Sequence, residues 1–274
     1  MKYPEATLEN YDAVYEHYTE YKPDPRVQRL VVALFSKVFD PYSHTADDVH
    51  DAVAERLDAG HRLIMTCTHH KLSDEFLPGE ELWHDPRLER VVGNAFVPAK
   101  QGYYKRGASQ RLFDALGARV VFRGADGGDD QLVEAAKEAF MATSVDSIVV
   151  DGKHMFVFPF GTRDKTPDGR GIVRRRDTSV KDIAYRSALE APVSLWPMAI
   201  YWGERKYATI PFMGKQVRIP DFSRRPDFAA GMPIDGPFAS PDHAMDFIQD
   251  ATVSALETCK QGRAERLGQL AIAA

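Results

Sequence analysis

The sequence predicts an α/β protein with a mostly parallel, mixed central sheet that is flanked by helices and preceded by an N-terminal helical section. Short apolar runs of strand length alternate with segments of helical periodicity over most of the chain. This alternation is typical of parallel sheets whose strands are joined by crossover helices. The chain has 274 residues, of which 44% are hydrophobic and 27% charged, enough for a large buried core.

Residues 1–60 are expected to form the helical section, packed on the core. Apolar residues recur at helical spacing between residues 27 and 38, after a turn at Pro23-Asp24-Pro25. A capping sequence at residues 45–48 is expected to start a second helix, which ends at Gly60.

Residues 61–274 are expected to form the α/β domain. The expected strands cover residues 63–67, 95–97, 119–122, 147–150, 155–158 and 192–202. The expected helices between them cover residues 108–116, 130–142 and 178–189. Asp151-Gly152 is expected to be the turn between the strands at 147–150 and 155–158.

The C-terminal part is less regular. Residues 206–210 and 216–219 are expected to pair as a hairpin, and the proline-rich stretch 220–241 is expected to be irregular. The last helix is expected to begin with Ser240 as its N-cap and Pro241 at its first position.

The composition excludes several classes of protein. The formal net charge is −5, so the overall charge gives no reason to expect nucleic acid as a partner. Cys67 and Cys259 are the only cysteines, which excludes a disulfide scaffold. The sequence has neither a recognisable signal peptide nor a predominantly apolar, uncharged run of 18 residues. We therefore expect a cytoplasmic protein that can lie on the inner face of the membrane without spanning it.

Cofactor chemistry has no motif in this sequence. A glycine-rich dinucleotide fingerprint and a P-loop are both absent. His61, His84, His154 and His243 have no metal-ligand spacing with one another. We expect neither a cofactor nor a metal.

The first candidate for chemistry is the segment Thr68-His69-His70-Lys71-Leu72-Ser73-Asp74, which directly follows a buried strand. Ligands bind at the carboxyl ends of strands in open α/β sheets. If the chain turns into a helix at Asp74, the Asp74 carboxylate can orient the His69 imidazole, which then acts as a general base. The alternative is a polar loop in which Asp74 only caps a helix. The spacing alone favours this alternative.

The second candidate is Phe158-Pro159-Phe160-Gly161-Thr162-Arg163, which follows another expected strand. Gly161 allows the backbone to approach a ligand closely. Arg163 can bind phosphate or carboxylate through two parallel hydrogen bonds. The alternative is a turn with an arginine that faces solvent.

In this order, the two segments resemble the first and third blocks of the glycerolipid acyltransferase family, which acylates glycerol phosphate and lysophosphatidic acid. The first block of that family is His-x4-Asp, and the third is Phe-Pro-Glu-Gly-Thr-Arg. The second block resembles Gly117-Ala118-Arg119-Val120-Val121-Phe122-Arg123, and the fourth resembles residues 192–198. The blocks span residues 68 to about 200. Neither the first 60 residues nor the last 70 or so carry a matching block.

The resemblance implies transfer of a fatty acyl group from the thioester of acyl-CoA or acyl carrier protein to a hydroxyl, as in phospholipid biosynthesis. It implies His69 as the general base and Asp74 as its orienting partner, with no covalent acyl-enzyme. The residues that it implies in substrate binding are Lys100, Arg123, Phe160, Gly161, Thr162 and Arg163. The acceptor is expected to be a small molecule or a lipid. The lack of an apolar anchor is similar to the soluble, plastid-type glycerol-3-phosphate acyltransferases.

The segment after the third block is basic. Residues 165–176 include Lys165, Arg170 and three successive arginines, 174–176. They offer a contact for CoA phosphates, an acidic carrier protein or an anionic membrane surface. The sequence equally allows the alternative, a basic loop that is exposed to solvent and binds no ligand.

One position departs from the family pattern. Phe160 stands where the family has glutamate, so an apolar ring replaces a carboxylate that can bind hydroxyls. Two alternatives stay open: a specialised O- or N-acyltransferase for a non-glycerolipid acceptor, and a non-catalytic protein that binds lipid or acyl carrier protein. A nucleophilic Cys67 is a third hypothesis, but the apolar strand around it predicts a buried, unreactive thiol.

Overall fold

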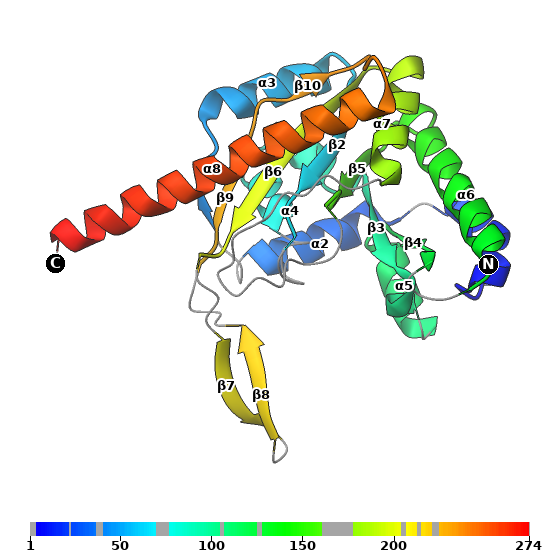
Figure 1. Ribbon diagram of the computed structural model, residues 1–274, viewed down its shortest axis with the longest axis horizontal. Coiled ribbons are helices and arrows are strands. Elements are labelled where there is room, and N and C mark those ends of the chain that lie inside the picture. The colour runs from blue at the N-terminus through cyan, green and yellow to red at the C-terminus, as the bar shows by residue number, and fades with distance from the viewer. Residues whose placement is uncertain are drawn as a thin grey trace.

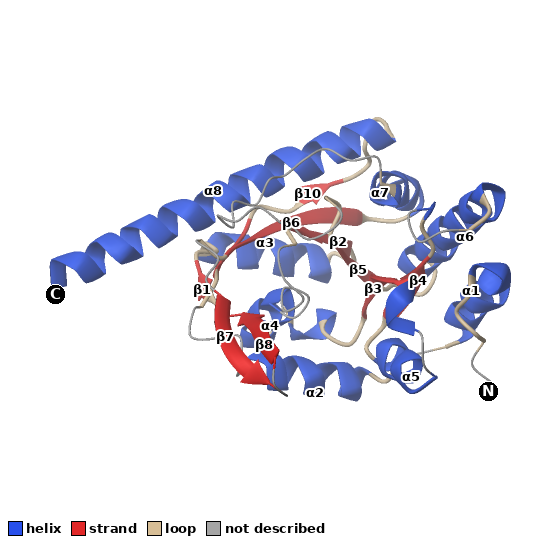
Figure 2. Cartoon of the chain, turned by 60° about the horizontal axis from the view of Figure 1, so that its bottom comes forward, coloured by secondary structure: helices blue, strands red, loops and turns tan. Residues whose placement is uncertain are grey.

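A central sheet lies between two layers of helices in the computed structural model (Figures 1 and 2). The structure describes residues 4–21, 23–36, 41–69, 77–104, 107–124, 128–160, 178–203, 207–212, 215–220 and 225–273. Within these ranges the sheet has eight strands, most of them parallel to their neighbours. The predicted fold class, a mixed α/β sheet flanked by helices, is therefore confirmed.

The sheet has the strand order β1-β9-β6-β2-β5-β3-β4, and β10 pairs with β6. The strands are β1 (Tyr42–Ser43), β2 (Arg62–Cys67), β3 (Ala95–Lys100), β4 (Ala118–Val121), β5 (His154–Val157), β6 (Val193–Tyr201), β9 (Asp227–Ala230) and β10 (Ile234–Asp235). Adjacent strands from β6 through β2, β5 and β3 to β4 are parallel, whereas β9 and β10 run antiparallel to β6. The carboxyl ends of these five parallel strands therefore lie at one edge of the sheet.

The central position of β2 follows from its composition. Leu63, Met65 and Cys67 face one hydrophobic cluster, and Ile64 faces the cluster on the other side of the sheet. All four side chains are buried. A short apolar run without alternation is typical of a parallel strand that is covered on both faces.

The helices cover both faces of the sheet. One face carries α1 (Tyr11–Glu20), α6 (Asp130–Val149), α7 (Ser179–Glu190) and α8 (Pro241–Ala273). The other carries α2 (Pro25–Ser36), α3 (Asp47–Asp58) and α4 (Leu77–His84). Helix α5 (Gly107–Ala115) lies beside β4. The described residues also form the 3-10 turns η1 (Leu8–Asn10), η3 (Glu89–Val91) and η4 (Gln101–Tyr104). Figure 2 shows the sheet almost edge-on between the two layers.

Several expected boundaries are confirmed by the backbone. Helix α3 ends just before Gly60, which has a φ of 86°, and α5 ends just before Gly117, which has a φ of 77°. Both glycines adopt the left-handed region that favours residues without a Cβ atom. The expected hairpin is also present: β7 (Tyr207–Phe212) pairs antiparallel with β8 (Lys215–Pro220) and projects from the body (Figure 1).

The strand expected at residues 147–150 is wrong. Helix α6 continues to Val149, and the Asp151-Gly152 turn connects a helix, rather than a strand, to β5. Met141, Val145 and Ile148 are buried at helical spacing, so they extend the apolar stripe of α6. The β-branched residues near the end of the helix mimic a strand when they are considered alone.

The stretch 220–241 is also more regular than expected. It contains β9 and β10, and β9 joins β1 to the rest of the sheet. Phe228 and Ala229 are fully buried in β9. Prolines on both sides of this four-residue strand conceal it in the sequence.

The first 60 residues also contribute to the sheet. Strand β1 pairs in parallel with β9, and Tyr15 and Tyr18 of α1 pack in the same hydrophobic cluster as Phe140 of α6. The division of the chain at residue 60 remains a prediction.

A buried carboxylate attaches the long helix α8 to the sheet. Asp227 is fully buried in β9 and accepts hydrogen bonds from Arg263 Nη1 at 2.7 Å and Arg266 Nη2 at 3.1 Å. His44 Nε2 lies 2.9 Å from the same carboxylate. Helix α8 has 33 residues, so it is about 50 Å long, and its C-terminal end extends past the sheet (Figure 1). No helix among the described residues is both long and apolar enough to cross a membrane.

We predict that Asp227→Ala lowers the free energy of unfolding by about 3–5 kcal/mol, because it leaves two arginines near a buried site without their counter-charge. Urea denaturation measures this change. The control is Asp250→Ala, because Asp250 lies in the same helix and has no described ion pair to the sheet. This substitution should change the free energy of unfolding by less than about 0.5 kcal/mol. An equally small effect of Asp227→Ala would contradict the proposed attachment.

A second stability prediction concerns His154, which is buried at the start of β5. The backbone N–H of Leu63 donates to His154 Nδ1 at 3.0 Å, so the neutral ring carries its proton on Nε2. Burial, together with Arg62 and Arg90, lowers the pKa of His154 to about 4. The unfolded chain binds this proton near pH 6.5, but the folded protein does not bind it until about pH 4. The contribution of the neutral His154 to the free energy of unfolding is therefore fully present above pH 6.5. It is lost as the pH falls from 6.5 to about 4, by on the order of 3 kcal/mol in total.

The matched variant for this prediction is His154→Asn, because the asparagine oxygen can accept the same hydrogen bond without titrating. Denaturation between pH 4 and 7 should show a steeper loss of stability for the wild type than for His154→Asn. Parallel pH profiles would exclude His154 as the source of the loss.

Candidate functional site

The candidate site lies at the edge where the parallel strands β2, β5, β3 and β4 end. The register pairs Thr66 of β2 with Val157 of β5, so the residues that follow these strands emerge side by side. Lys100, the last residue of β3, pairs with Val121, the last residue of β4. Four chain segments that are far apart in the sequence therefore meet at one edge.

Thr68 fixes the chain just before the predicted base. Its hydroxyl donates to the carbonyl of Ile200 at 3.2 Å and accepts from the N–H of the same residue at 2.8 Å. Thr68 is buried, so this pair of bonds holds the end of β2 against β6 without competition from water. The position of His69, the next residue, depends on this attachment.

The His69 ring packs against the aromatic side chain that follows β5. The ring centroids of His69 and Phe158 lie 4.2 Å apart, with 30° between the ring planes. Phe158 in turn contacts Phe156 edge-on, with 4.9 Å between centroids. The first and third sequence blocks thus contact each other directly, and the imidazole has a defined orientation.

A cavity of about 680 Å³ opens at this edge. His69, Lys100, Arg123, Phe158 and Pro159 line it on the side of the sheet. Helix α6 and the beginning of α7 form the opposite wall, with Glu134, Lys137, Phe140, Thr178, Ser179 and Val180. The volume lies in the usual range for small-molecule sites.

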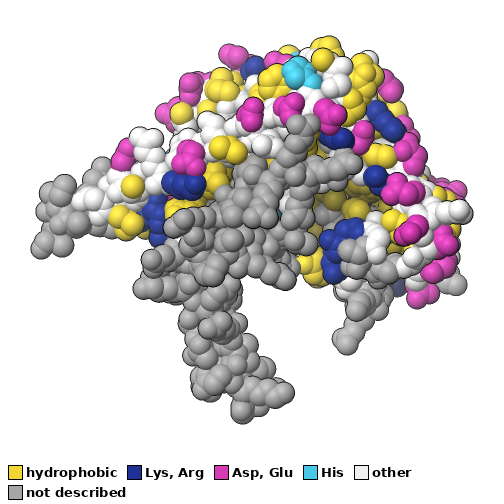
Figure 3. Space-filling view, viewed as in Figure 1, with side chains coloured by type: hydrophobic (Ala, Val, Ile, Leu, Met, Phe, Trp, Pro, Cys, Tyr) yellow, Lys and Arg dark blue, Asp and Glu magenta, His cyan; other side chains and the backbone are white. Residues whose placement is uncertain are grey.

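The described lining residues of this cavity have an excess of positive charge. Lys100, Arg123 and Lys137 are cationic, and Glu134 is the one carboxylate among them. Lys137 Nζ lies 3.4 Å from Glu134, and both side chains are substantially exposed. Figure 3 shows Lys and Arg side chains beside a hydrophobic hollow near β3, whereas Asp and Glu predominate on the outer surface near α6. Such a cavity can attract an anion and hold an apolar group beside it.

Comparison with solved structures shows that the chain is similar to the crystal structure of the 1-acyl-sn-glycerophosphate (LPA) acyltransferase, PlsC, from Thermotoga maritima. The TM-score is 0.54, the sequence identity is 18%, and the match covers 91% of this chain and 88% of the other. The two chains share a fold. No protein-family model matches the sequence, and no curated protein matches it.

Three of the predicted site residues line this one cavity: His69, Lys100 and Arg123. Phe160, predicted to bind substrate, is only 9% exposed, packs in the larger hydrophobic cluster and is not among the lining residues. The other predicted residues, Asp74, Gly161, Thr162 and Arg163, lie outside the described residues, as does the basic segment 165–176. The roles of all these residues remain predictions.

Sequence reasoning did not find Glu134 and Lys137, which reach the cavity from α6. Two neighbouring positions of the helix are buried: Val133, which directly precedes Glu134, and Phe140, which lies about one turn after Lys137. A lysine between apolar positions at helical spacing is the signal that could have identified Lys137.

A nucleophilic role for Cys67 has little geometric support. Cys67 is fully buried in β2 and is not among the cavity residues, so its thiol cannot reach a substrate there. Among the described residues, no group of three or more His, Cys, Asp or Glu side chains is arranged to hold a metal ion.

The attachment of Thr68 can be tested by a pair of substitutions in the same strand region. We predict that Thr68→Val lowers the free energy of unfolding by about 1–3 kcal/mol, because both backbone groups of Ile200 lose a buried partner. Thr66→Val is the matched control: Thr66 is fully buried, but within the described residues its hydroxyl has no hydrogen-bond partner. The control should be neutral or stabilising. Equal losses for the two variants, measured by urea denaturation, would contradict the role of Thr68.

Proposed function

We propose that the protein is an acyltransferase that moves a fatty acyl group from an acyl-CoA or acyl-carrier-protein thioester to a hydroxyl of a glycerol-phosphate-like or lysophospholipid-like acceptor. The observation that carries the proposal is the cavity at the carboxyl ends of the parallel strands, where His69 faces the same space as Lys100 and Arg123. The fold shared with a glycerophosphate acyltransferase supports it.

In this proposal His69 is the general base. Its imidazole takes the proton of the acceptor hydroxyl as the oxygen attacks the thioester carbonyl. The tetrahedral intermediate then collapses, the carbon–sulfur bond breaks, and the imidazolium returns the proton to the departing thiolate. Asp74 would orient the ring and stabilise the imidazolium. The ring of Phe158 restricts the imidazole from the other direction.

The cationic residues would bind the phosphate of the acceptor. Lys100 and Arg123 come from the ends of adjacent strands, and Arg123 can contact two phosphate oxygens at once. Gly161, Thr162 and Arg163 would complete this subsite from the third block. Lys137, on the opposite wall, supplies a further positive charge. An excess of cations over carboxylates favours a dianionic acceptor over a neutral one.

The apolar part of the cavity would hold the beginning of the acyl chain. Phe122, Phe140, Met155, Val157 and Phe158 contribute to its lining. Their burial removes water from the thioester, which strengthens the electrostatic contacts of the transition state. The donor would be acyl-CoA or acyl carrier protein, and a membrane surface would present a lipid acceptor.

Phe160 keeps a second acceptor class open. Its ring is buried in the core, so no carboxylate stands at the position where the resembled family has glutamate. A specialised O- or N-acyltransferase for a non-glycerolipid acceptor would use the same base without that carboxylate. The acceptor panel below separates the two.

The decisive experiment measures thiol release from palmitoyl-CoA and palmitoyl-acyl carrier protein with glycerol 3-phosphate, lysophosphatidic acid, non-phosphorylated alcohols and amines as acceptors. We expect release that depends on a phosphate-bearing acceptor, and we expect His69→Ala to reduce it by at least about 10²–10⁴-fold. His243→Ala, an exposed histidine on α8, is the control and should retain the wild-type rate. Activity that survives His69→Ala would rule out the proposed base. Binding of the donor without turnover would instead favour a non-catalytic binding protein.

The phosphate subsite has its own prediction. Arg123→Gln should raise KM for the phosphate-bearing acceptor by about tenfold or more, because a charge-assisted contact is lost, and should change kcat less. Lys137→Gln should act in the same direction but more weakly, because Glu134 lies 3.4 Å from its ammonium and already compensates part of its charge. Steady-state kinetics at constant salt provides the comparison. An unchanged KM for Arg123→Gln would place the acceptor phosphate elsewhere.

A further inference from the structure

Three elements meet at Glu81, a buried carboxylate of helix α4. The residue is 6% exposed. Its Oε1 accepts a hydrogen bond from Ser43 Oγ of β1 at 2.8 Å and lies 3.1 Å from His50 Nε2 of α3. A carboxylate is rarely buried this far without such partners. Glu81 therefore joins α4 to the strand and the helix that precede it in the chain, and Figure 2 shows α3 and α4 on the same side of the sheet.

His50 lies between two carboxylates. Its Nε2 faces Glu81, and its Nδ1 is 3.9 Å from Oδ2 of Asp85, which directly follows α4. A neutral imidazole has an N–H on only one of its two nitrogens, whereas an imidazolium has an N–H on both. Only the protonated ring can present an N–H to both carboxylates, so the geometry favours the imidazolium.

Arg87 and Asp51 belong to the same cluster. Arg87 donates hydrogen bonds to Asp85 and to Asp51, which follows His50 in α3. The hydrogen bond to Glu81 raises the pKa of His50 above its ordinary value, and burial opposes this rise. The charges of Glu81 and Asp85 raise the pKa further, whereas the positive charge of Arg87 lowers it. Protonated His50 therefore persists to a higher pH than an unperturbed histidine does.

Helix α4 is the element that follows the candidate base. Residues 70–76, which include Asp74, connect His69 to the first residue of α4. Thr68 holds the chain before this interval, and the attachment of α4 sets where the interval ends. Because Asp74 orients His69 in the proposed mechanism, the place of α4 bears on this pair.

We propose that His50 is a positioning residue that acts as a pH-sensitive latch on α4. As an imidazolium it holds α4 to α3 through Glu81 and Asp85, and loss of its proton loosens α4 at the end of the segment that contains Asp74. The consequence for catalysis rests on the proposed function, whereas the latch itself does not.

The latch is expected to be strongest at mildly acidic pH. A histidine whose pKa is raised by folding stabilises the folded state fully below its unfolded value, near pH 6.5. It loses this contribution as the pH rises through the folded value. His69 acts in the opposite direction, because a general base must be unprotonated to accept a proton. Thiol release should therefore rise with pH as His69 loses its proton, and fall at higher pH as the latch opens.

Hydrogen–deuterium exchange of the peptide 77–88 tests the latch without turnover. After correction for the intrinsic pH dependence of exchange, its protection in the wild type should fall by about tenfold between pH 6 and 9, the usual size of a hydrogen bond to a charged group. His50→Lys, which stays charged, should keep the protection. His50→Gln, which is never charged, should have low protection at every pH. His61→Gln is the matched control and should change nothing, because His61 also lies near a carboxylate, Asp235, but directly before β2.

A further variant tests the other side of the pair. Glu81→Gln keeps the shape of the side chain but removes its charge, so it should also abolish the pH dependence of protection. Thermal unfolding monitors the fold of each variant. Wild-type protection that does not change with pH, or that changes equally in His50→Gln, would overturn the latch whatever the activity.

The pH profile of thiol release tests the connection to the site. The fall at high pH should be present in the wild type and in His61→Gln and absent in His50→Lys. His50→Gln should lower kcat with little change in KM, because no substrate contact is removed. A fall that persists unchanged in His50→Lys would overturn the connection to catalysis. A protein that shows the latch by exchange but releases no thiol with any acceptor would support the latch and contradict the proposed function.

Discussion

Strand β2 lies in the middle of the sheet, hydrogen-bonded in parallel to β5 on one side and to β6 on the other. This double pairing constrains the rest of the molecule. It requires apolar side chains on both faces of β2, and therefore a helical layer on each side. It also sets the direction of the neighbouring strands, so that the segments that follow β2, β5, β3 and β4 meet at one edge. The hydroxyl of Thr68 extends this constraint by one residue beyond the strand.

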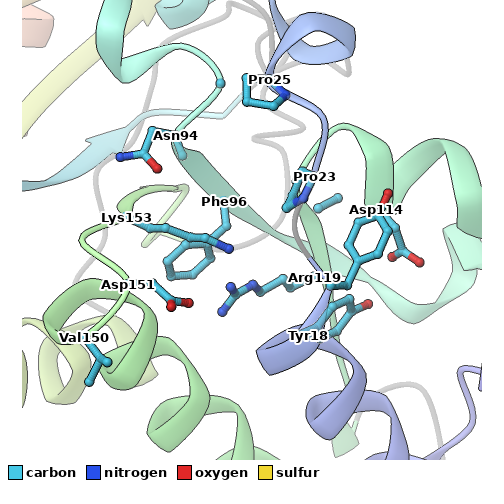
Figure 4. Close-up of a pocket in the computed structure, with 15 residues that line it drawn as sticks. Tyr18, Pro23, Pro25, Asn94, Phe96, Asp114, Arg119, Val150, Asp151 and Lys153 are labelled. Atoms are coloured by element: carbon cyan, nitrogen blue, oxygen red, sulfur yellow. The ribbon is translucent and has the colours of Figure 1, made fainter. Parts of the chain in front are cut away.

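The same strands carry different chemistry at their two ends. At the carboxyl edge, His69, Lys100 and Arg123 surround an open cavity in which a reaction can take place. At the amino edge, Arg119 and Lys153 are buried and line a second cavity (Figure 4). The second sequence block therefore contributes an arginine to each edge, four residues apart. Because the strands between the edges are stiff and tightly packed, a ligand at the carboxyl edge would meet a preformed wall.

The place of His69 after a buried strand was visible in the sequence, whereas Lys100 and Arg123 were predicted from the family resemblance. The three line one cavity because the parallel strands that carry them end at the same edge. Glu134 and Lys137 escaped prediction because they reach the cavity from a helix, and the side on which a helix lies is set by packing. The end of α6 was missed for a related reason: β-branched residues also fit a buried helical stripe. Strand β9 was missed because its pairing with β1 joins residues more than 180 positions apart, which no local pattern records.

The anchoring of α8 has a consequence for the order in which the protein folds. Asp227 is paired by Arg263 and Arg266, which follow it by 36 and 39 residues. During synthesis, β9 therefore emerges well before the arginines that neutralise its buried carboxylate. Until that helix is made, Asp227 lacks both arginines, and an uncompensated carboxylate opposes the burial of β9 in the sheet. The last side of the sheet should thus form late, after the parallel strands have already assembled.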